Sequence, residues 1–318
     1  MIEVHNLVKT YGSFHAVKDV SFTVESDHVL GFLGPNGAGK TTIMKILTGY
    51  HFPSGGQALV NGLSVQEYPV EVKRLIGYLP ESVPLYGELT VDEYLNFAAA
   101  ARLIEKPQRR AKIGAALEAC GLGNVRGKRI ETLSKGYKQR TGLAGAILHD
   151  PEILILDEPT TGLDPNQIIE IRSLIKELGK SKTVILSTHI LQEVEAVCSQ
   201  VLILNEGRIA AQGTPEAIAG EMRGGLTWML ALKGGNAESV RTALENFGAD
   251  NVALEIINVM ENDGAVEASF LIKDVQNQNQ NAEQIFDWAV KNEFKILQMN
   301  TKKISLEDIF VKLTNEAA

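Results

Sequence analysis

The segment GPNGAGKT, residues 34–41, constrains the fold of this chain more than any other part of the sequence. An apolar run, VLGFL at 29–33, precedes it, and a helical pattern follows it as far as Gly49. A glycine-rich turn between a strand and a helix can bind phosphate, because its backbone N–H groups point at the anion from the positive end of the helix. The sequence therefore predicts a nucleotide-binding loop, or P-loop, at this position.

The residue types in the loop predict separate contacts with the nucleotide. Lys40 would reach the β- and γ-phosphates, the Thr41 hydroxyl would ligate Mg²⁺, and Thr42 would lie near the α-phosphate. The predicted nucleotide-binding residues of the loop are Gly34, Pro35, Asn36, Gly37, Ala38, Gly39, Lys40, Thr41 and Thr42.

Two acidic residues follow the apolar run ILIL at 153–156. A P-loop enzyme needs an acid at the end of a neighbouring strand to hold Mg²⁺, and Asp157 suits that role. Glu158 would polarise the attacking water as a general base. The alternative is an Asp-Glu pair that caps the next helix. Asp164 follows in a turn that its neighbouring Gly and Pro favour, and we predict that it is a further nucleotide-binding residue.

His189 ends a further apolar strand, TVILST at 183–188. A lone His at a strand end is usually structural. Here we expect the strand to run beside the nucleotide-binding strands, so we predict a contact between His189 and the γ-phosphate. Lys40, Glu158 and His189 are thus the predicted catalytic residues.

The order of elements predicts an α/β fold. Continuous apolar strands alternate with helical patterns over the first 220 residues, which indicates a mainly parallel sheet covered on both faces. Residues 90–148 carry no clear strand pattern and are expected to form a helical insert. Thr90 and Glu93 have the spacing of a capping box, which would start its first helix.

Residues 226–318 differ in character, and RGG at 223–225 reads as a linker. The pattern predicts the order β-α-β-β-α-β, which is that of a small ferredoxin-like α+β domain. We expect its first helix to end at Gly248, the QNQNQN run at 276–281 to form a loop, and Ser305 to cap a last helix. The predicted domains are therefore 1–220 and 226–318.

The composition excludes several classes of protein. The net charge of −8 comes without a basic stripe, so nucleic-acid binding is not expected. Cys120 and Cys198 are the only cysteines, which favours a reducing compartment. No stretch reaches the roughly 18 uninterrupted apolar residues that a membrane-spanning helix needs. If the protein serves a membrane process, another polypeptide must supply the membrane part.

The motifs GPNGAGKTT, LSKGYKQR, ILILDEPTTGLDP and STH, in this order and spacing, resemble those of an ABC-type ATPase over roughly residues 1–220. The resemblance implies a P-loop NTPase (RecA-like) nucleotide-binding domain with a helical subdomain and an N-terminal β-subdomain. It also implies that Tyr11 stacks against the adenine of ATP, a role that needs only the face of an aromatic ring. The alternative is an ordinary strand tyrosine.

LSKGYKQR, at 133–140, corresponds to the family's signature motif. By this resemblance, Ser134 and Gly136 would bind the γ-phosphate of an ATP held by the P-loop of a second copy, so two composite sites require a homodimer. Lys135 replaces a Gly of the common motif and Tyr137 replaces its Gln. This SKG form is similar to ATPases of ABC-2 exporters of the drug-resistance and gliding-motility type.

Glu81 is a second departure from the family pattern, which has Gln at this point of IGYLPESVPLYGELT. A carboxylate is a hard oxygen ligand that Mg²⁺ accepts, although its charge also repels the γ-phosphate. We predict that Glu81 contacts Mg²⁺ or couples the core to the helical subdomain. The alternative is a plain loop charge.

Together these observations predict the ATP-hydrolysing subunit of an ABC-type transporter, with ATP and Mg²⁺ bound at the P-loop. It would power a separate polytopic membrane subunit by ATP-driven dimerisation, from a peripheral position at the cytoplasmic face of the inner membrane. The resemblance favours export. A soluble ABC ATPase of translation or DNA repair is the alternative. The C-terminal domain would be a regulatory or dimerisation module.

Overall fold

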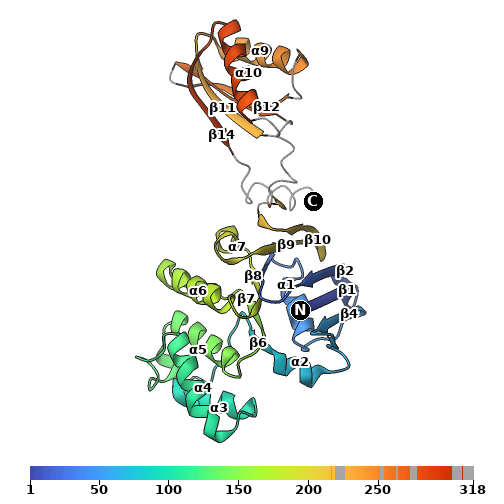
Figure 1. Ribbon diagram of the computed structural model, residues 1–318, viewed down its shortest axis with the longest axis vertical. Helices are drawn as coiled ribbons and strands as arrows, with labels where there is room; N and C mark the ends of the chain where they lie inside the picture. The colour runs from blue at the N-terminus through green and yellow to red at the C-terminus, as the bar shows by residue number, and fades with distance from the viewer. Residues whose placement is uncertain are drawn as a thin grey trace. The chain divides into compact units, whose positions relative to one another are not determined.

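A computed structural model describes residues 1–215, 217–218, 226–250, 254–262, 264–272, 278–302 and 310 (Figure 1). The chain divides into two compact units, one containing Met1–Pro215 and the other within Glu216–Lys312. Each unit has its own hydrophobic core. The domain bounds 1–220 and 226–318 stay a prediction, and the RGG linker and the Ser305 cap lie outside the described residues. Among the described helices, none is both long enough and apolar enough to cross a membrane.

The first unit begins with an antiparallel sheet of order β2-β1-β4-β5. A tight hairpin joins its first two strands, where Tyr11 pairs with Phe14 and Gly12 takes a φ of 59° that suits a glycine. The strands are β1 (Ile2–Tyr11), β2 (Phe14–Val24), β4 (Gly55–Val60) and β5 (Leu63–Ser64).

A six-stranded sheet of order β10-β9-β3-β8-β7-β6 forms the centre of the first unit. Every pairing in it is parallel except that of β10 with β9. The strands are β3 (Val29–Leu33), β6 (Ile76–Leu79), β7 (Ile153–Asp157), β8 (Thr183–Thr188), β9 (Gln200–Asn205) and β10 (Arg208–Gly213). β3, β7 and β8 are buried along their whole length, which explains their continuous apolar sequences and confirms the predicted parallel sheet.

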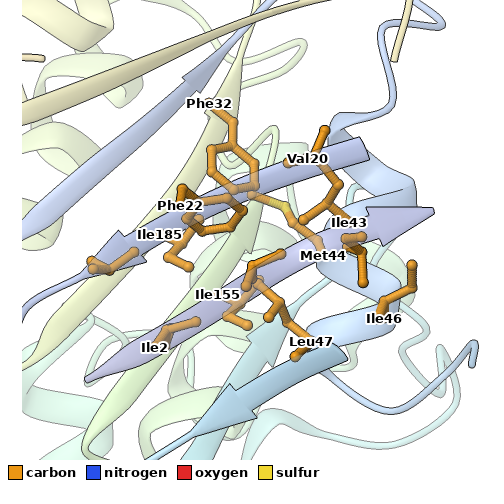
Figure 2. Close-up of a cluster of buried hydrophobic side chains, with 14 of the residues drawn as sticks. Ile2, Val20, Phe22, Phe32, Ile43, Met44, Ile46, Leu47, Ile155 and Ile185 are labelled. Carbon is orange, nitrogen blue, oxygen red and sulfur yellow. The ribbon is translucent and has the colours of Figure 1, made fainter. Parts of the chain in front are cut away.

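Helix α1 (Lys40–Leu47) lies between the two sheets (Figure 2). Its buried apolar side chains, Ile43, Met44, Ile46 and Leu47, belong to one core cluster with residues of both sheets. The rings of Phe22 and Phe32 meet edge to face in this cluster, with centroids 5.4 Å apart. The helix that starts at the P-loop is therefore fixed on two sides. The other helices on the core are α2 (Pro69–Leu75), α6 (Pro165–Leu178) and α7 (Leu191–Val197).

The predicted helical insert is confirmed. It contains α3 (Val91–Ala101), α4 (Lys106–Ala119), a short 3-10 helix η1 (Ile130–Thr132) and α5 (Lys135–Ile147). The capping box at its start is complete, because Glu93 N donates to Thr90 Oγ1 at 3.3 Å and Thr90 N donates to Glu93 Oε2 at 2.8 Å.

The second unit has the predicted order β-α-β-β-α-β, with a sheet of order β12-β13-β11-β14 whose pairings are all antiparallel. This is the ferredoxin-like arrangement. Trp288 lies at the centre of its core, between Phe247 and Phe294, and donates its indole N–H to Ala243 O at 3.0 Å. The elements are β11 (Leu226–Lys233), α9 (Ala237–Asp250), β12 (Leu254–Asn262), β13 (Ala265–Ile272), α10 (Gln278–Lys291) and β14 (Lys295–Lys302).

Two boundary predictions in this unit are wrong. Helix α9 continues through Gly248 to Asp250, because Gly248 keeps a helical conformation and serves instead for close approach to Leu254. Helix α10 begins at Gln278, inside the run predicted as a loop. Burial of Ile285 and Trp288 stabilises this helix, and polar composition alone does not prevent a helix from extending.

Candidate active site

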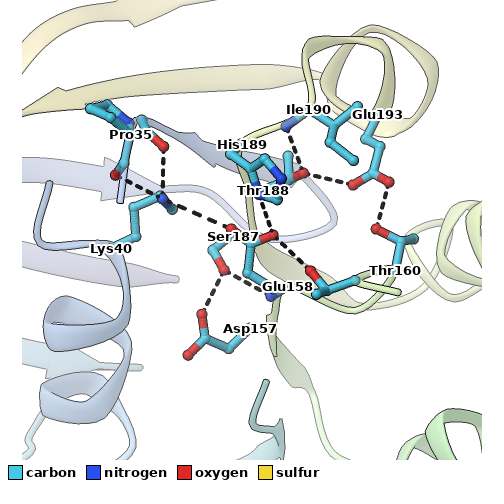
Figure 3. A network of polar contacts seen from close by, with 12 residues as sticks. Pro35, Lys40, Asp157, Glu158, Thr160, Ser187, Thr188, His189, Ile190 and Glu193 are labelled. Carbon is cyan, nitrogen blue, oxygen red and sulfur yellow. Dashed lines mark hydrogen bonds and ion pairs between the residues drawn. The ribbon is translucent and has the colours of Figure 1, made fainter. Parts of the chain in front are cut away.

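The P-loop joins β3 to α1 and curls around the side chain of Lys40. Gly37 and Gly39 have φ values of 85° and 103°, which L side chains rarely adopt. The Lys40 ammonium donates to Gly34 O at 2.7 Å and to Pro35 O at 3.1 Å (Figure 3). Burial lowers the pKa of Lys40, and the carboxylates of Glu158, Asp157 and Glu81 partly oppose that shift.

Asp157 ends β7 and lies against the start of α1. Its Oδ1 accepts from Thr41 Oγ1 at 3.1 Å and from Ser187 Oγ, on the neighbouring strand β8, at 2.6 Å. Asp157 and Ser187 are also register partners in the parallel sheet. The hydroxyl and the carboxylate predicted to hold Mg²⁺ are thus neighbours, although 116 residues separate them in the sequence.

Glu158 has a φ of 49°, which is in the left-handed region and costs a non-glycine residue about 1–2 kcal/mol. Its N–H donates to Ser187 Oγ at 2.9 Å. One carboxylate oxygen, Oε1, lies 3.8 Å from Lys40 Nζ, and the other, Oε2, lies 2.9 Å from His189 Nδ1. The strained backbone therefore directs a carboxylate between a cation and an imidazole.

His189 follows β8 at the same edge of the sheet (Figure 3). A contact of its Nδ1 with an ionised carboxylate requires a proton on that nitrogen, which leaves Nε2 as the acceptor of the neutral ring. The His189 side chain is 49 % exposed, whereas that of Glu158 is 9 % exposed. The imidazole thus stands between the buried carboxylate and solvent.

A cleft of about 400 Å³ brings most of the predicted residues together. We call it the site cleft. It is lined by Phe14, Ala16, Asn36, Gly37, Ala38, Gly39, Lys40, Thr41, Thr42, Glu81, Glu158, Thr161 and His189. Glu81 thus shares a wall with the P-loop. The described lining includes Phe14 but not Tyr11, which is 43 % exposed and meets the His51 ring edge to face with centroids 5.9 Å apart.

The signature residues Ser134 and Gly136, and also Asp164, lie elsewhere in the unit. Ser134 is the N-cap of α5 and accepts from Tyr137 N at 3.4 Å. Gly136 is buried where an added Cβ would lie 2.5 Å from Gln167 side-chain atoms. Asp164 is the N-cap of α6 and accepts from Gln167 N at 3.0 Å. In the part of the chain that the structure describes, these three residues do not line the site cleft.

The donor set at the start of α1 fits Mg²⁺. This ion prefers oxygen ligands and usually binds one or two protein oxygens together with phosphates and water. Thr41 and Asp157 supply a hydroxyl and a carboxylate within 3.1 Å of each other. Glu81 supplies a further carboxylate in the site cleft.

Comparisons with known proteins show the family of this chain. A family model described as ABC transporter matches residues 17–161. An uncharacterised ABC transporter ATP-binding protein of Bacillus subtilis, YxlF, is 34 % identical over 99 % of this chain and 100 % of its own length. The chain belongs to the ABC transporter ATP-binding family. The motif order, the parallel sheet and the P-loop cleft are those of an ABC ATPase domain.

Two further relatives extend the comparison. The linearmycin resistance ATP-binding protein LnrL of Bacillus subtilis is 29 % identical over 99 % of this chain and 98 % of its own length. Among solved structures, cbiO1 of Clostridium perfringens, described as part of the ABC transporter complex cbiONQ, has a TM-score of 0.64 and 30 % identity. The match covers 69 % of this chain and 90 % of the cbiO1 chain.

Sequence analysis missed several residues of this ABC ATP-binding site. Ser187 anchors both Asp157 and the Glu158 backbone. Its only sequence signal is its place two residues before His189. Phe14 and Thr161 line the site cleft without belonging to a predicted contact. Their positions follow from the hairpin and from the loop after β7, which local patterns do not place in space.

Proposed function

We propose that this ABC ATP-binding subunit hydrolyses ATP and uses the energy to drive a separate membrane subunit, most simply an exporter. The observation that carries the proposal is the convergence of Lys40, Thr41, Asp157, Glu158 and His189 at one edge of the central sheet. The names of the relatives support a transporter, and the alternative of a soluble ATPase has no support among them.

The chain's own residues divide the chemistry between them. Lys40 would bind the β- and γ-phosphates, because its ammonium lies inside the curve of the P-loop. Thr41 and Asp157 would hold Mg²⁺, which neutralises charge on those phosphates when bound. Glu158 would take a proton from the attacking water, with His189 Nδ1–H orienting its Oε2 and Lys40 facing its Oε1.

The position of the signature motif supports a homodimer. Ser134 and Gly136 begin helix α5 outside the site cleft of their own chain. A second copy facing the P-loop would bring its own signature helix, N-terminus first, towards the γ-phosphate. ATP would then bind between two copies, and hydrolysis would release them.

A groove between the core and the helical subdomain supports docking of a membrane subunit. This docking groove, of about 480 Å³, is lined by the loop after β6 and by α3, with the aromatic residues Tyr50, Tyr78, Tyr86, Tyr94 and Phe97. The rings of Tyr86 and Phe97 meet with centroids 5.3 Å apart and are each about half exposed. We assign it to a short cytoplasmic helix of the membrane subunit, since an amphipathic helix buries its apolar face in such a groove. A peripheral position at the cytoplasmic face of the membrane is part of this proposal.

The exporter assignment has two supports. The SKG form of the signature is similar to that of ABC-2 exporters, and one relative that matches along almost the whole chain is named for linearmycin resistance.

The first test is the substitution Glu158→Gln. We expect ATP to bind with unchanged affinity and kcat to fall by about 100-fold or more, the usual contribution of a general base. Glu177→Gln is the matched control, because Glu177 is an exposed acid of the same unit whose carboxylate pairs with Lys180. Hydrolysis at the normal rate by Glu158→Gln would refute the general-base role.

The second test identifies the partner. Tagged Glu158→Gln protein, purified from its own cells with ATP after detergent solubilisation, should bring down a polytopic membrane protein. Phe97→Asp should abolish this co-purification, and Leu103→Asp should not, because Leu103 is exposed in the same subdomain but outside the docking groove. Ribosomes, DNA or a soluble companion in place of a membrane protein would contradict the proposal.

A further inference from the structure

Glu193 is a buried carboxylate that the proposed chemistry does not use. It lies in α7, with 2 % of its surface exposed. Its Oε1 accepts from Thr160 Oγ1 at 2.5 Å and its Oε2 accepts from Thr188 Oγ1 at 2.7 Å (Figure 3). Buried charges are rare unless they are paired, so the surroundings of this carboxylate need an explanation.

Its two hydroxyl partners lie next to the predicted catalytic pair: Thr160 is in the loop after β7, and Thr188 is the last residue of β8. Thr160 follows Glu158 by two residues, and Thr188 directly precedes His189. Both threonines are buried, with at most 3 % of their surface exposed. Thr188 Oγ1 also accepts from Ile190 N at 3.0 Å, so Thr188 holds the backbone on the far side of His189.

The sheet itself does not fix these two segments to each other. The pairing of β7 with β8 ends at Asp157 and Ser187, and Glu158 and His189 both lie beyond that last pair. Beyond that pair, Ser187 Oγ accepts from Glu158 N. Glu193 then bridges Thr188, the residue after Ser187, and Thr160, two residues after Glu158. Glu193 therefore connects the loop after β7 to the end of β8, beyond the last backbone pair of these two strands.

A carboxylate suits this position better than an amide. Both threonine hydroxyls donate towards it, and an ionised carboxylate offers an acceptor on each oxygen. Arg172 Nη2, from α6, lies 3.5 Å from Glu193 Oε1 and contributes the compensating positive charge. A glutamine would keep the shape but would offer only one acceptor oxygen.

We propose that Glu193 is a positioning residue that clamps the loop carrying Glu158 to the loop carrying His189, through Thr160 and Thr188. The clamp sets the 2.9 Å contact between Glu158 Oε2 and His189 Nδ1, and with it the direction of the general base. The inference rests on the proposed ATP hydrolysis, because it assigns a residue that orients that same site.

The test removes each hydroxyl without changing side-chain shape. Thr160→Val and Thr188→Val delete the donors to Glu193, and Thr160→Ser and Thr188→Ser retain them. Thr183→Val is the matched control, because Thr183 is a buried threonine at the other end of β8 whose hydroxyl likewise accepts a backbone N–H, that of Asp27. The full chain is used throughout, and Glu193→Gln completes the set.

For each variant we would measure kcat and KM for MgATP, the stoichiometry of ATP binding, and Tm. We expect the two valine variants and Glu193→Gln to lose about 10- to 100-fold in kcat per ATP-binding site, the scale of a small misplacement of a catalytic group. KM should change less than about threefold, because the P-loop contacts are untouched. The serine variants should recover most of the lost rate, and the control should keep the normal rate.

Two results separate failure of this inference from failure of the proposed function. A normal kcat per binding site in the valine variants, with Glu158→Gln inactive, would overturn the clamp alone. Normal hydrolysis by Glu158→Gln would overturn the general base and with it the clamp. If Thr188→Val does not bind ATP, Thr160→Val and Glu193→Gln decide, because they leave β8 unchanged. A fall in Tm with no fall in kcat per site would also refute positioning, since it would show a purely structural role.

Discussion

His149 should make the first unit less stable in mild acid. It follows α5 and lies near the start of β6, where its Nε2 is 3.1 Å from Ile76 O. Its Nδ1 is buried and has no hydrogen-bond partner among the described residues. Burial, assisted by the positive charge of Arg102, lowers the pKa of His149 to about 4. The ring is therefore neutral in the folded protein.

The sign and size of the effect follow from proton linkage. Between the folded pKa of about 4 and the unfolded value of about 6.5, the unfolded chain binds more protons at His149, so the free energy of unfolding rises with pH across that window. The contribution is fully present above pH 6.5 and is lost as the pH falls towards 4. Lowering the pH from about 7.5 to about 5 should cost about 2 kcal/mol, from 1.36 kcal/mol per pH unit within the window.

Urea unfolding at the two pH values measures this loss. His149→Gln is the control, because an amide can still donate to Ile76 O but does not titrate. Far-UV circular dichroism follows both units, while tryptophan fluorescence reports the second unit alone, because the only tryptophans are Trp228 and Trp288. The difference in the free energy of unfolding between the two pH values should be about 2 kcal/mol smaller in His149→Gln than in the unaltered protein. The fluorescence transition of the second unit should be the same in both proteins. Equal pH dependence in both proteins would refute the assignment of a buried neutral His149.

Three further predictions concern single residues. Glu81→Gln should retain ATPase activity, since Gln serves in similar ATPases; a complete loss of hydrolysis would show that the charge is required. Tyr11→Ala should raise KM for ATP by roughly 10-fold, from the loss of about 1–3 kcal/mol of stacking. If only Phe14→Ala has that effect, adenine stacks on Phe14, the aromatic residue that lines the site cleft. Thr90→Ala should lower the free energy of unfolding in urea by about 1 kcal/mol, and Thr90→Ser should lower it much less, because Thr90 caps α3. Equal free energies of unfolding for the Ala and Ser variants would contradict this.

The local features of the fold could be predicted from neighbouring residues. The P-loop lies between a strand and a helix, the capping box of Thr90 and Glu93 starts α3, and Ser134 caps α5. Each depends on side chains within a few residues of the backbone groups that they satisfy. The order of elements in the second unit followed from hydrophobic periodicity in the same way.

Element boundaries were harder to predict from the sequence where tertiary burial competes with local preference. Gly248 did not end α9, because the helix there packs closely on Leu254. The polar run at 276–281 did not stay a loop, because α10 is stabilised by Ile285 and Trp288 in the core. Trp288 packs on Phe247 and Phe294, so the contacts that stabilise α10 come from outside the helix.

The sequence by itself determined which residue types the site would use, and only the tertiary structure decided how they meet. Asp157 could be assigned to Mg²⁺ from its place after a strand, but its shared contacts with Thr41 and Ser187 depend on the order of β3, β8 and β7 in the sheet. Glu193 has no local pattern that marks it, because its contact with Thr160 joins residues 33 apart and depends on where the loop after β7 meets the end of β8. Capping and periodicity act over a few residues, whereas parallel strands bring together side chains whose separation along the chain carries no signal.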